Sequence, residues 1–161
     1  MFPHLHRILL ILACCTPAFG AGVETWSPEM SMHVETIDKV VPSPDGEWVA
    51  YTRTRAVMAK EKSEMVTQIH VARCDGSRRF QLTAGEKSAT SPTFSPDSEY
   101  VYFLSRRSGE LNIWRISIEG GEAQSITNWE GSIGSHQVSP DGKWIAFLGR
   151  KKDVELERAK L

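Results

Sequence analysis

The sequence predicts an all-β fold, a partial β-propeller of about two and a half four-stranded antiparallel blades. The first observation is a repeated turn tetrapeptide, Ser-Pro-Asp-Gly or Ser-Pro-Asp-Ser, which begins at Ser43, at Ser95 (52 positions later) and at Ser139 (44 later). The second is the short run of aromatic and β-branched residues that follows each copy. The third is that segment 69–83 matches segment 113–127 at the same offset of 44. A period near 44 residues, built from short strands and turns, is typical of a propeller blade.

The tetrapeptide is itself a turn signal. Proline presets φ at the first corner, aspartate bonds to its own backbone, and glycine takes the position with positive φ. Ser98 replaces glycine in the middle copy, which weakens the signal a little. The runs that follow are too short for helices and rich in strand-forming residues, so strands are predicted. Asp75-Gly76 and residues 119–121 predict hairpins between the third and fourth strands of two blades.

Residues 1–20 have the composition of a secretory signal peptide. Arg7 supplies a positive start, residues 8–15 are apolar but too few to span a bilayer, and residues 18–20 form a small-x-small cleavage site. Residues 11–14 also fit a bacterial lipoprotein box, in which a lipidated Cys14 would anchor the chain to a membrane. Either alternative predicts a periplasmic or secreted protein.

The charge and the cysteine content of the remaining residues limit the possible partners. Without the leader, about 140 residues carry 18 basic side chains (19 minus Arg7) and 20 acidic ones. This balance offers no basic footprint for nucleic acid and no polybasic patch for a membrane. Only Cys74 remains outside the leader, so no internal disulfide is possible and stability must come from burial.

Residues 21–39 are predicted to be a lead-in with a short helix. Ser27 is a suitable N-cap and Pro28 a suitable first residue. Met30, Val34 and Ile37 would share one face of about two turns, packed on the propeller.

The blades are predicted at 40–83, 91–127 and 135–161, the last incomplete. The eight extra residues of blade one (52 minus 44) must lie between Thr52 and Val66, in a charged hairpin tip near 60–64 that is either solvated or a partner-recognition loop. Two and a half blades cannot close a ring, which takes about four to eight. We therefore expect a fragment of a longer protein or a truncated reading frame.

No catalytic, cofactor or metal site is predicted. Residues 131–135 place serine and glycine in the wrong order for a nucleophile elbow, and are predicted to be a flexible connection between blades. Gly120-Gly121 lacks the context of a phosphate loop. The histidines outside the leader are isolated, and each repeated turn offers one carboxylate where calcium needs several oxygen ligands. These residues are His33, His70 and His136, and Asp45, Asp97 and Asp141.

The tryptophans are the remaining candidates. Trp48, Trp114 and Trp144 lie in strand runs and are predicted to be core residues. Trp129 lies in a loop, where it could face a ligand, although packing at the core or rim is the better interpretation.

The repeats resemble the propellers of TolB-type periplasmic proteins and of the prolyl oligopeptidase family of serine peptidases. The likeness lies in the Ser-Pro-Asp-Gly turn followed by Trp-Val-Ala-Tyr or Trp-Ile-Ala-Phe, in Ile-Trp-Arg-Ile, in Gly-Gly-Glu-Ala, and in the closing Leu-Thr or Ile-Thr. The lead-in, residues 26–30 with Val34 and residues 41–46, is similar to that of secreted bacterial dipeptidyl-peptidases and acylaminoacyl-peptidases. So is the charged stretch between second and third strands, with Arg150 and Arg158 flanking it.

For the peptidase family the resemblance implies an α/β-hydrolase domain after the propeller, which holds the catalytic triad. No residue here matches a triad position, so the chain alone is expected to be inactive, with a role in gating and positioning short peptides. The alternative is a TolB-like protein-binding scaffold without activity. TolB-like proteins carry a separate α/β domain before the propeller, and the lead-in is too short for one. A reading frame without a role is a third possibility.

Overall fold

The computed structural model describes residues 26–59 and 62–151. The predicted signal peptide, Cys14 and the tail 152–161 lie outside the described residues. One short helix precedes ten strands: α1 (Pro28–Met32), β1 (Thr36–Pro42), β2 (Trp48–Ala59), β3 (Lys62–Arg73), β4 (Arg79–Gln81), β5 (Ala89–Phe94), β6 (Tyr100–Ser108), β7 (Glu110–Ser117), β8 (Gln124–Ser125), β9 (Gly131–Val138) and β10 (Ile145–Lys151).

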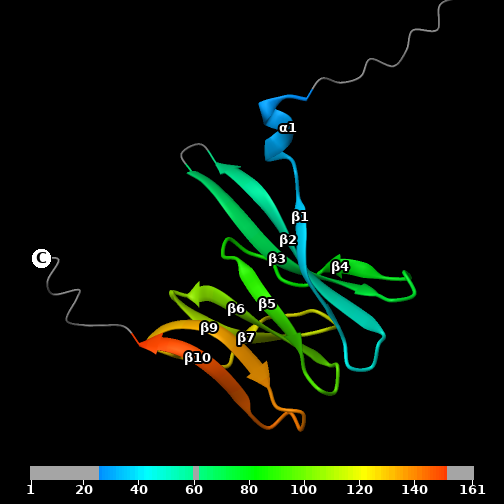
Figure 1. The fold of residues 1–161 in the computed structure, drawn as a ribbon, viewed down its shortest axis with the longest axis vertical. Helices are drawn as coiled ribbons and strands as arrows, with labels where there is room; N and C mark the ends of the chain where they lie inside the picture. Colours follow the sequence, from blue (N-terminus) through cyan, green and yellow to red (C-terminus); the bar gives the residue numbers. More distant parts are fainter. Residues whose placement is uncertain (1–25, 60–61, 152–161) are drawn as a thin grey trace, which may run out of the picture.

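The strands form consecutive antiparallel meanders (Figure 1). The first sheet has the order β1-β2-β3-β4, and β5, β6, β7 and β8 pair in the same order in the second. The β9–β10 hairpin begins a third unit and joins β7 through one parallel bridge, between Leu111 and Ser132. The predicted all-β partial propeller is therefore confirmed.

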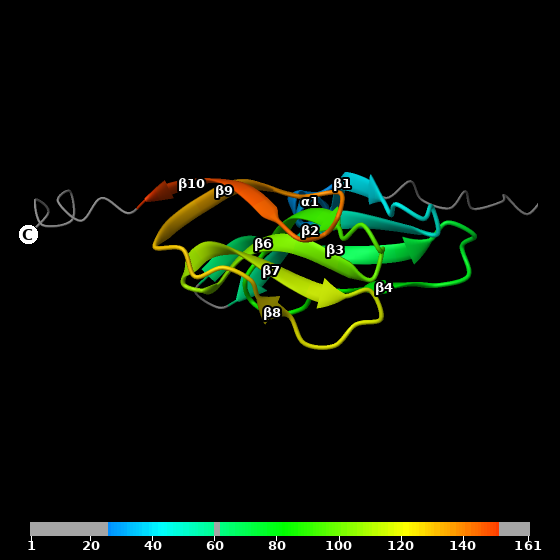
Figure 2. The ribbon, with the colours of Figure 1, turned by 90° about the horizontal axis from the view of Figure 1, so that it is seen from below.

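The first strands of successive blades lie side by side. β5 contacts β1 on one side and β9 on the other. Figure 2 shows β1 and β9 on one side of the molecule and β8 on the opposite side. The first strands of two blades also share a β-bulge, with positive φ at Lys39 (50°) and at Ser91 (54°), 52 positions apart. The repeat read from the turns thus extends to the backbone conformation of the strands.

Blades one and two pack face to face because alternate strand residues point to opposite faces. Ala50 and Val71 on blade one, and Val101 and Phe103 on blade two, are fully buried in one cluster. The opposite face of blade two, with Tyr102, Leu104 and Ile113, packs on Ile133 of β9 in a second cluster. Each complete blade therefore presents one face to each neighbouring position in the ring.

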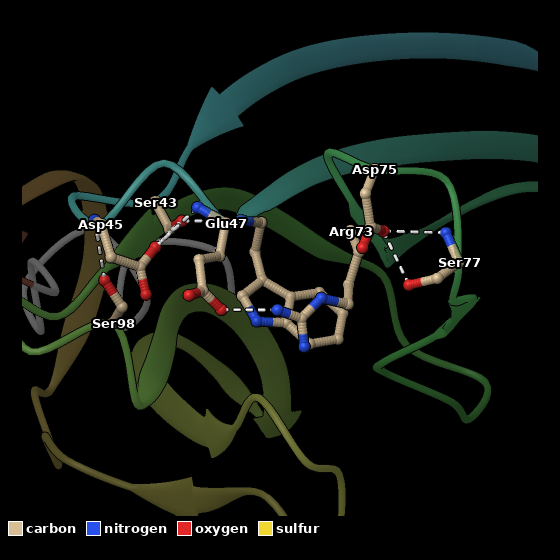
Figure 3. A network of polar contacts seen from close by, with 8 residues as sticks. Ser43, Asp45, Glu47, Arg73, Asp75, Ser77 and Ser98 are labelled. Atoms are coloured by element: carbon tan, nitrogen blue, oxygen red, sulfur yellow. Dashed lines mark hydrogen bonds and ion pairs between the residues drawn. The ribbon is translucent and has the colours of Figure 1, made fainter.

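The three Ser-Pro-Asp turns have the same hydrogen bonds, and Figure 3 shows the first of them. The Ser43 hydroxyl donates to Asp45 Oδ1 (2.5 Å) and accepts from the backbone N–H of Trp48 (2.9 Å). The N–H of Glu47 donates to the same carboxylate at 2.9 Å. The turns at 95–98 and 139–142 repeat all three bonds. This network ties each first strand to the start of the second.

Ser98, which replaces glycine in the second turn, makes a contact between blades that the sequence does not predict. It keeps the left-handed conformation, with φ of 63°, and is buried. Its hydroxyl accepts a hydrogen bond from the backbone N–H of Asp45 at 3.2 Å. The turn of blade two is therefore bonded directly to the turn of blade one (Figure 3).

The extra residues of blade one lengthen a hairpin. β2 and β3 have twelve residues each and pair in register as far as Ala59 and Lys62. β6 and β7 have nine and eight residues. The insertion expected between Thr52 and Val66 therefore continues the ladder, and its residues 60–61 lie outside the described part.

The predicted helix is shorter than expected. α1 has five residues, capped by the Ser27 side chain, which accepts from the N–H of Met30 at 3.4 Å. Ile37 lies in β1, and Met30, Val34 and Ile37 are 37%, 51% and 62% exposed. The prediction of an apolar face packed on the propeller is wrong, because β1 begins before a second turn can form and separates these side chains.

The predicted flexible connection at 131–135 is also wrong. These residues begin β9, four positions before the expected start of blade three, and Ile133 is fully buried. Gly131 lies against the backbone of Arg150, so a side chain there would collide with β10. The glycine-rich composition reflects close strand approach here rather than freedom of the chain.

Trp144 is not a core residue. It is 74% exposed, whereas Trp48, at the equivalent position of blade one, is 5% exposed. Trp48 packs edge-on against Phe80 of β4 and lies beneath the guanidinium of Arg73. Such partners come from third and fourth strands, and the described residues supply only two strands to the third blade.

The contact between turns predicts different outcomes for two substitutions at Ser98. Ser98→Ala removes the acceptor and keeps the strained φ, so it should lower the free energy of unfolding by about 1 kcal/mol. Ser98→Gly removes the same bond but relieves a comparable backbone strain, so it should stay within about 0.5 kcal/mol of the parent. Urea unfolding followed by tryptophan fluorescence measures both. An unchanged free energy of unfolding for Ser98→Ala, with Ser98→Gly more stable than the parent, would contradict the inter-turn bond.

The close approach at Gly131 predicts that Gly131→Ala is destabilising. An added Cβ would overlap the carbonyl oxygen of Arg150, at a φ of 147° that disfavours L-residues. The expected cost is about 1–3 kcal/mol of unfolding free energy. Gly134→Ala is the matched control, since its Cβ would be an ordinary 3.9 Å from the Leu148 oxygen. Similar unfolding midpoints for the two variants would show that β9 does not approach β10 in this way.

The turns also predict a pH dependence. Hydrogen bonds from the Ser95 hydroxyl and then from the N–H of Glu99 hold the pKa of Asp97 below its usual value of 3.8. A depressed pKa in the folded state contributes stability above pH 3.8 that is lost as the pH falls through the folded value. Asp97→Asn keeps an acceptor but does not titrate, so its unfolding midpoint should fall less between pH 5 and about pH 2. If the unfolding midpoints of parent and variant fall in parallel with pH, Asp97 does not contribute this stability.

Candidate functional site

The main hollow of the described residues lies on the face of blade one that points away from blade two. It has a volume of about 520 Å³ and is lined by side chains of β1 to β4 and by Glu35: Glu35, Ile37, Tyr51, Arg53, His70, Arg79, Phe80 and Gln81. The strand alternation that buries Ala50 and Val71 against blade two turns Tyr51 and His70 to this side. The hollow is therefore a property of the exposed blade face.

Stacking and one ion pair order the hollow. The rings of Tyr51 and His70, which are opposite each other on β2 and β3, stack with centroids 5.6 Å apart and planes at 21°. Arg53 and Glu35 form an ion pair between partly exposed side chains. Burial, and then the nearby Arg53 charge, lower the pKa of His70, which favours the neutral imidazole.

The arrangement suits binding better than catalysis. Arg53 and Arg79 bring positive charge to the hollow, Glu35 brings negative charge, and Tyr51 and Phe80 supply aromatic surface. No serine, cysteine or threonine, the usual nucleophiles of acyl transfer, lines it. Such a surface can hold polar or aromatic groups of a partner by hydrogen bonds and ring contacts.

The equivalent face of blade two shows how the face with the hollow would be packed within a ring of blades. By the offsets of 52 and 44, Phe103 corresponds to Tyr51 and Trp114 to His70. Phe103 is fully buried and Trp114 is packed against the core between blades one and two. The hollow on blade one therefore occupies the position at which a preceding blade packs in a complete propeller.

The other candidates from the sequence do not assemble into a site. Trp129 packs edge-on against Phe147, with centroids 5.5 Å apart, and its indole N–H donates to the Arg150 carbonyl at 3.3 Å. Trp129 therefore packs at the rim. It also borders a shallow hollow of about 280 Å³, together with Asn128, Glu130 and Lys151.

The histidines do not form a metal site within the described residues. Both ring nitrogens of His136 are buried without a hydrogen-bond partner in the described part of the chain, and burial lowers its pKa. His33 follows α1 as its C-cap. Within residues 26–59 and 62–151 no group of three or more potential ligands could hold a metal ion. Asp45, Asp97 and Asp141 are engaged in their own turns, and Cys74 is exposed as a free thiol.

No local sequence pattern predicts the hollow at Tyr51 and His70. Their exposure depends on which blade has a neighbour, and the repeat offset could have shown that they correspond to core residues of blade two. Within the described residues, no helix has the length and apolarity to cross a bilayer.

Comparison with known sequences identifies the repeat. The sequence model of the "TolB beta propeller domain" matches residues 42–161, three quarters of the chain. Dipeptidyl-peptidase 5 of Porphyromonas endodontalis is 29% identical over 107 residues, which are 66% of this chain and 15% of that protein. In six curated relatives, the matched part is 7% to 27% of the relative's length.

Solved structures share the fold. A putative TolB from Agrobacterium tumefaciens superposes with a TM-score of 0.56 and 29% identity, over 70% of this chain and 38% of that one. The acylaminoacyl peptidase of Pyrococcus horikoshii superposes with a TM-score of 0.63 and 19% identity, over 81% of this chain and 20% of that one. The second likeness shows the fold alone. On the match across residues 42–161, this chain belongs to the TolB β-propeller domain family, whose repeats also occur in relatives named as peptidases.

Proposed function

We propose that this chain is the non-catalytic propeller part of a serine peptidase of the dipeptidyl- or acylaminoacyl-peptidase type. In this role it gates and positions short peptides for an α/β-hydrolase domain. The observation that carries the proposal is the similarity to Dipeptidyl-peptidase 5, which extends over 107 residues of this chain but only 15% of that relative. The remainder of the relative has room for a separate catalytic domain.

The geometry of the described residues is compatible with this role. The face of blade one away from blade two carries aromatic rings and arginines, as at Tyr51 and Arg53, and no serine, cysteine or threonine lines its main hollow. A propeller limits access by its shape and by the groups at its faces, while the bond-breaking residues belong to another domain. Residues 1–20, with the composition of an export signal, support a periplasmic or secreted location.

The second candidate is a TolB-like scaffold that binds proteins without enzymatic activity. It is supported by the family match itself and by the 29% identity to the putative TolB of Agrobacterium tumefaciens. The DNA that follows codon 161 separates the two candidates. A frame that continues to a Gly-x-Ser-x-Gly motif several hundred codons later supports the peptidase, and a stop after further blades supports the scaffold.

The proposal predicts that the purified chain does not hydrolyse chromogenic dipeptide amides. No triad is matched in the sequence, so the rate should equal that of buffer. A fluorescent fluorophosphonate should also fail to label the chain. Turnover that this serine-directed reagent abolishes would contradict the proposal, because it would require an activated serine within these residues. A prolyl oligopeptidase-family enzyme assayed in parallel is the positive control.

A further inference from the structure

The insertion of blade one leaves part of β3 with a free edge. β4 pairs only with His70, Val71 and Ala72, so β3 residues nearer the hairpin tip have no strand on that side among the described residues. On their other side these residues pair with β2 as far as Lys62 and Ala59. The overhang is therefore a two-stranded ribbon, which is less stable than a ribbon with a third strand.

Two hydrogen bonds show which backbone groups of β3 face the free side. The N–H of Ile69 donates to Thr83 Oγ1 (2.9 Å) and that of Thr67 donates to Ser88 Oγ (3.1 Å), both away from β2. Because alternate residues of a strand direct their backbone groups to the same edge, Met65 and Ser63 present their N–H and C=O there as well. Met65 is 60% exposed.

A hollow of about 300 Å³ runs along this edge. Three consecutive residues of β3, from Glu64 to Val66, line it. Since neighbouring side chains point to opposite faces of a strand, only a space alongside the strand edge can touch all three. Blade two closes the far side through Leu111 and Arg106, and Glu86 and Lys87 belong to the adjoining loop.

The repeat shows that this edge accepts a strand. Leu111, which corresponds to Thr67 at the offset of 44, forms a parallel bridge with Ser132 of β9. In blade one the residue equivalent to Ser132 is Ser88, which reaches Thr67 only through its side chain. β7 begins at Glu110, one residue before the bridge, whereas β3 extends five residues beyond Thr67 to Lys62. The insertion thus continues a strand-accepting edge without supplying its partner.

We propose that residues 63–67 are a docking site for an extended peptide that adds to the first sheet as a further strand. The site spans about 17 Å, enough for five extended residues. Main-chain hydrogen bonds would come from Ser63 and Met65 and from the carbonyl of Thr67, whose N–H already donates to Ser88. The flexible Met65 side chain and Leu111 suit apolar side chains of varied shape. Lys87 and Glu86 place both charge signs at the rim, which favours no net charge in the peptide. The site is independent of the proposed peptidase role.

The test is fluorescence anisotropy with a fluorescein-labelled hexapeptide, Thr-Val-Thr-Val-Thr-Val amide, titrated with the whole chain. Met65→Pro removes an outward N–H, which an edge tolerates, and should weaken binding about tenfold or more. Met58→Pro is the matched control. Met58 is also 60% exposed and lies on the opposite edge of the same hairpin, so this variant should bind as the parent does. A hexapeptide with central proline should not bind.

Amide hydrogen exchange gives a second readout. Bound peptide should slow exchange at Ser63 and Met65 and leave Met58 unchanged. Absence of binding at millimolar protein, or equal losses for Met65→Pro and Met58→Pro, would overturn the proposal. Slow exchange at Ser63 and Met65 that depends on protein concentration without peptide would overturn it too, since a second copy of the chain would then occupy the edge.

Discussion

Face-to-face burial between consecutive blades is the constraint on which the rest of the structure depends. Cys74, the cysteine among the described residues, is a free thiol, so apolar contact and hydrogen bonds hold the described sheets together. Phe103 of blade two is fully buried against blade one, and Ile133 of β9 is fully buried against the other face of blade two. Apolar burial of this kind is worth about 25 cal/mol per Å². Polar interactions then fix the register, most directly where Ser98 accepts from the backbone of Asp45.

This constraint explains which sequence predictions succeed. The Ser-Pro-Asp turns are local, since the bonds of Ser43 reach no further than Trp48, and a local pattern is readable in the sequence. Blade order follows from their spacing. The exposure of the Trp144 side chain depends instead on a neighbour beyond its own hairpin. It therefore cannot be read from the local sequence, which is nearly that around the buried Trp48.

The two other wrong predictions, a flexible connection at 131–135 and an apolar helix face in the lead-in, have the same origin. The glycines and serines of 131–135 look like a linker, yet Ile133 is held by contacts with a distant blade. The apolar residues Met30, Val34 and Ile37 have helical spacing, but pairing with β2 draws Ile37 into a strand. Tertiary contact overrides local propensity in both cases. The hollow at Tyr51 and His70 was missed because strand position, rather than residue type, decides its exposure.

Two features of blade one lie outside the core between the blades. The exposed face of blade one combines the Tyr51 and His70 rings with the Arg53 and Glu35 ion pair. The lengthened hairpin adds an exposed backbone edge beside Leu111. The first is the face on which a preceding blade packs in a complete propeller, and the second arises from the insertion in the same regular unit. An insertion in a repeat can thus expose a new strand edge while the core pattern is kept.

The stacking of successive blades is tested most directly by a nuclear Overhauser effect between the amide proton of Asp45 and the β protons of Ser98. These groups are 53 positions apart in the sequence, and the amide nitrogen and the hydroxyl oxygen are 3.2 Å apart. The account predicts a clear cross-peak at neutral pH. Its absence, with cross-peaks within each turn intact, would contradict the packing of blade two on blade one.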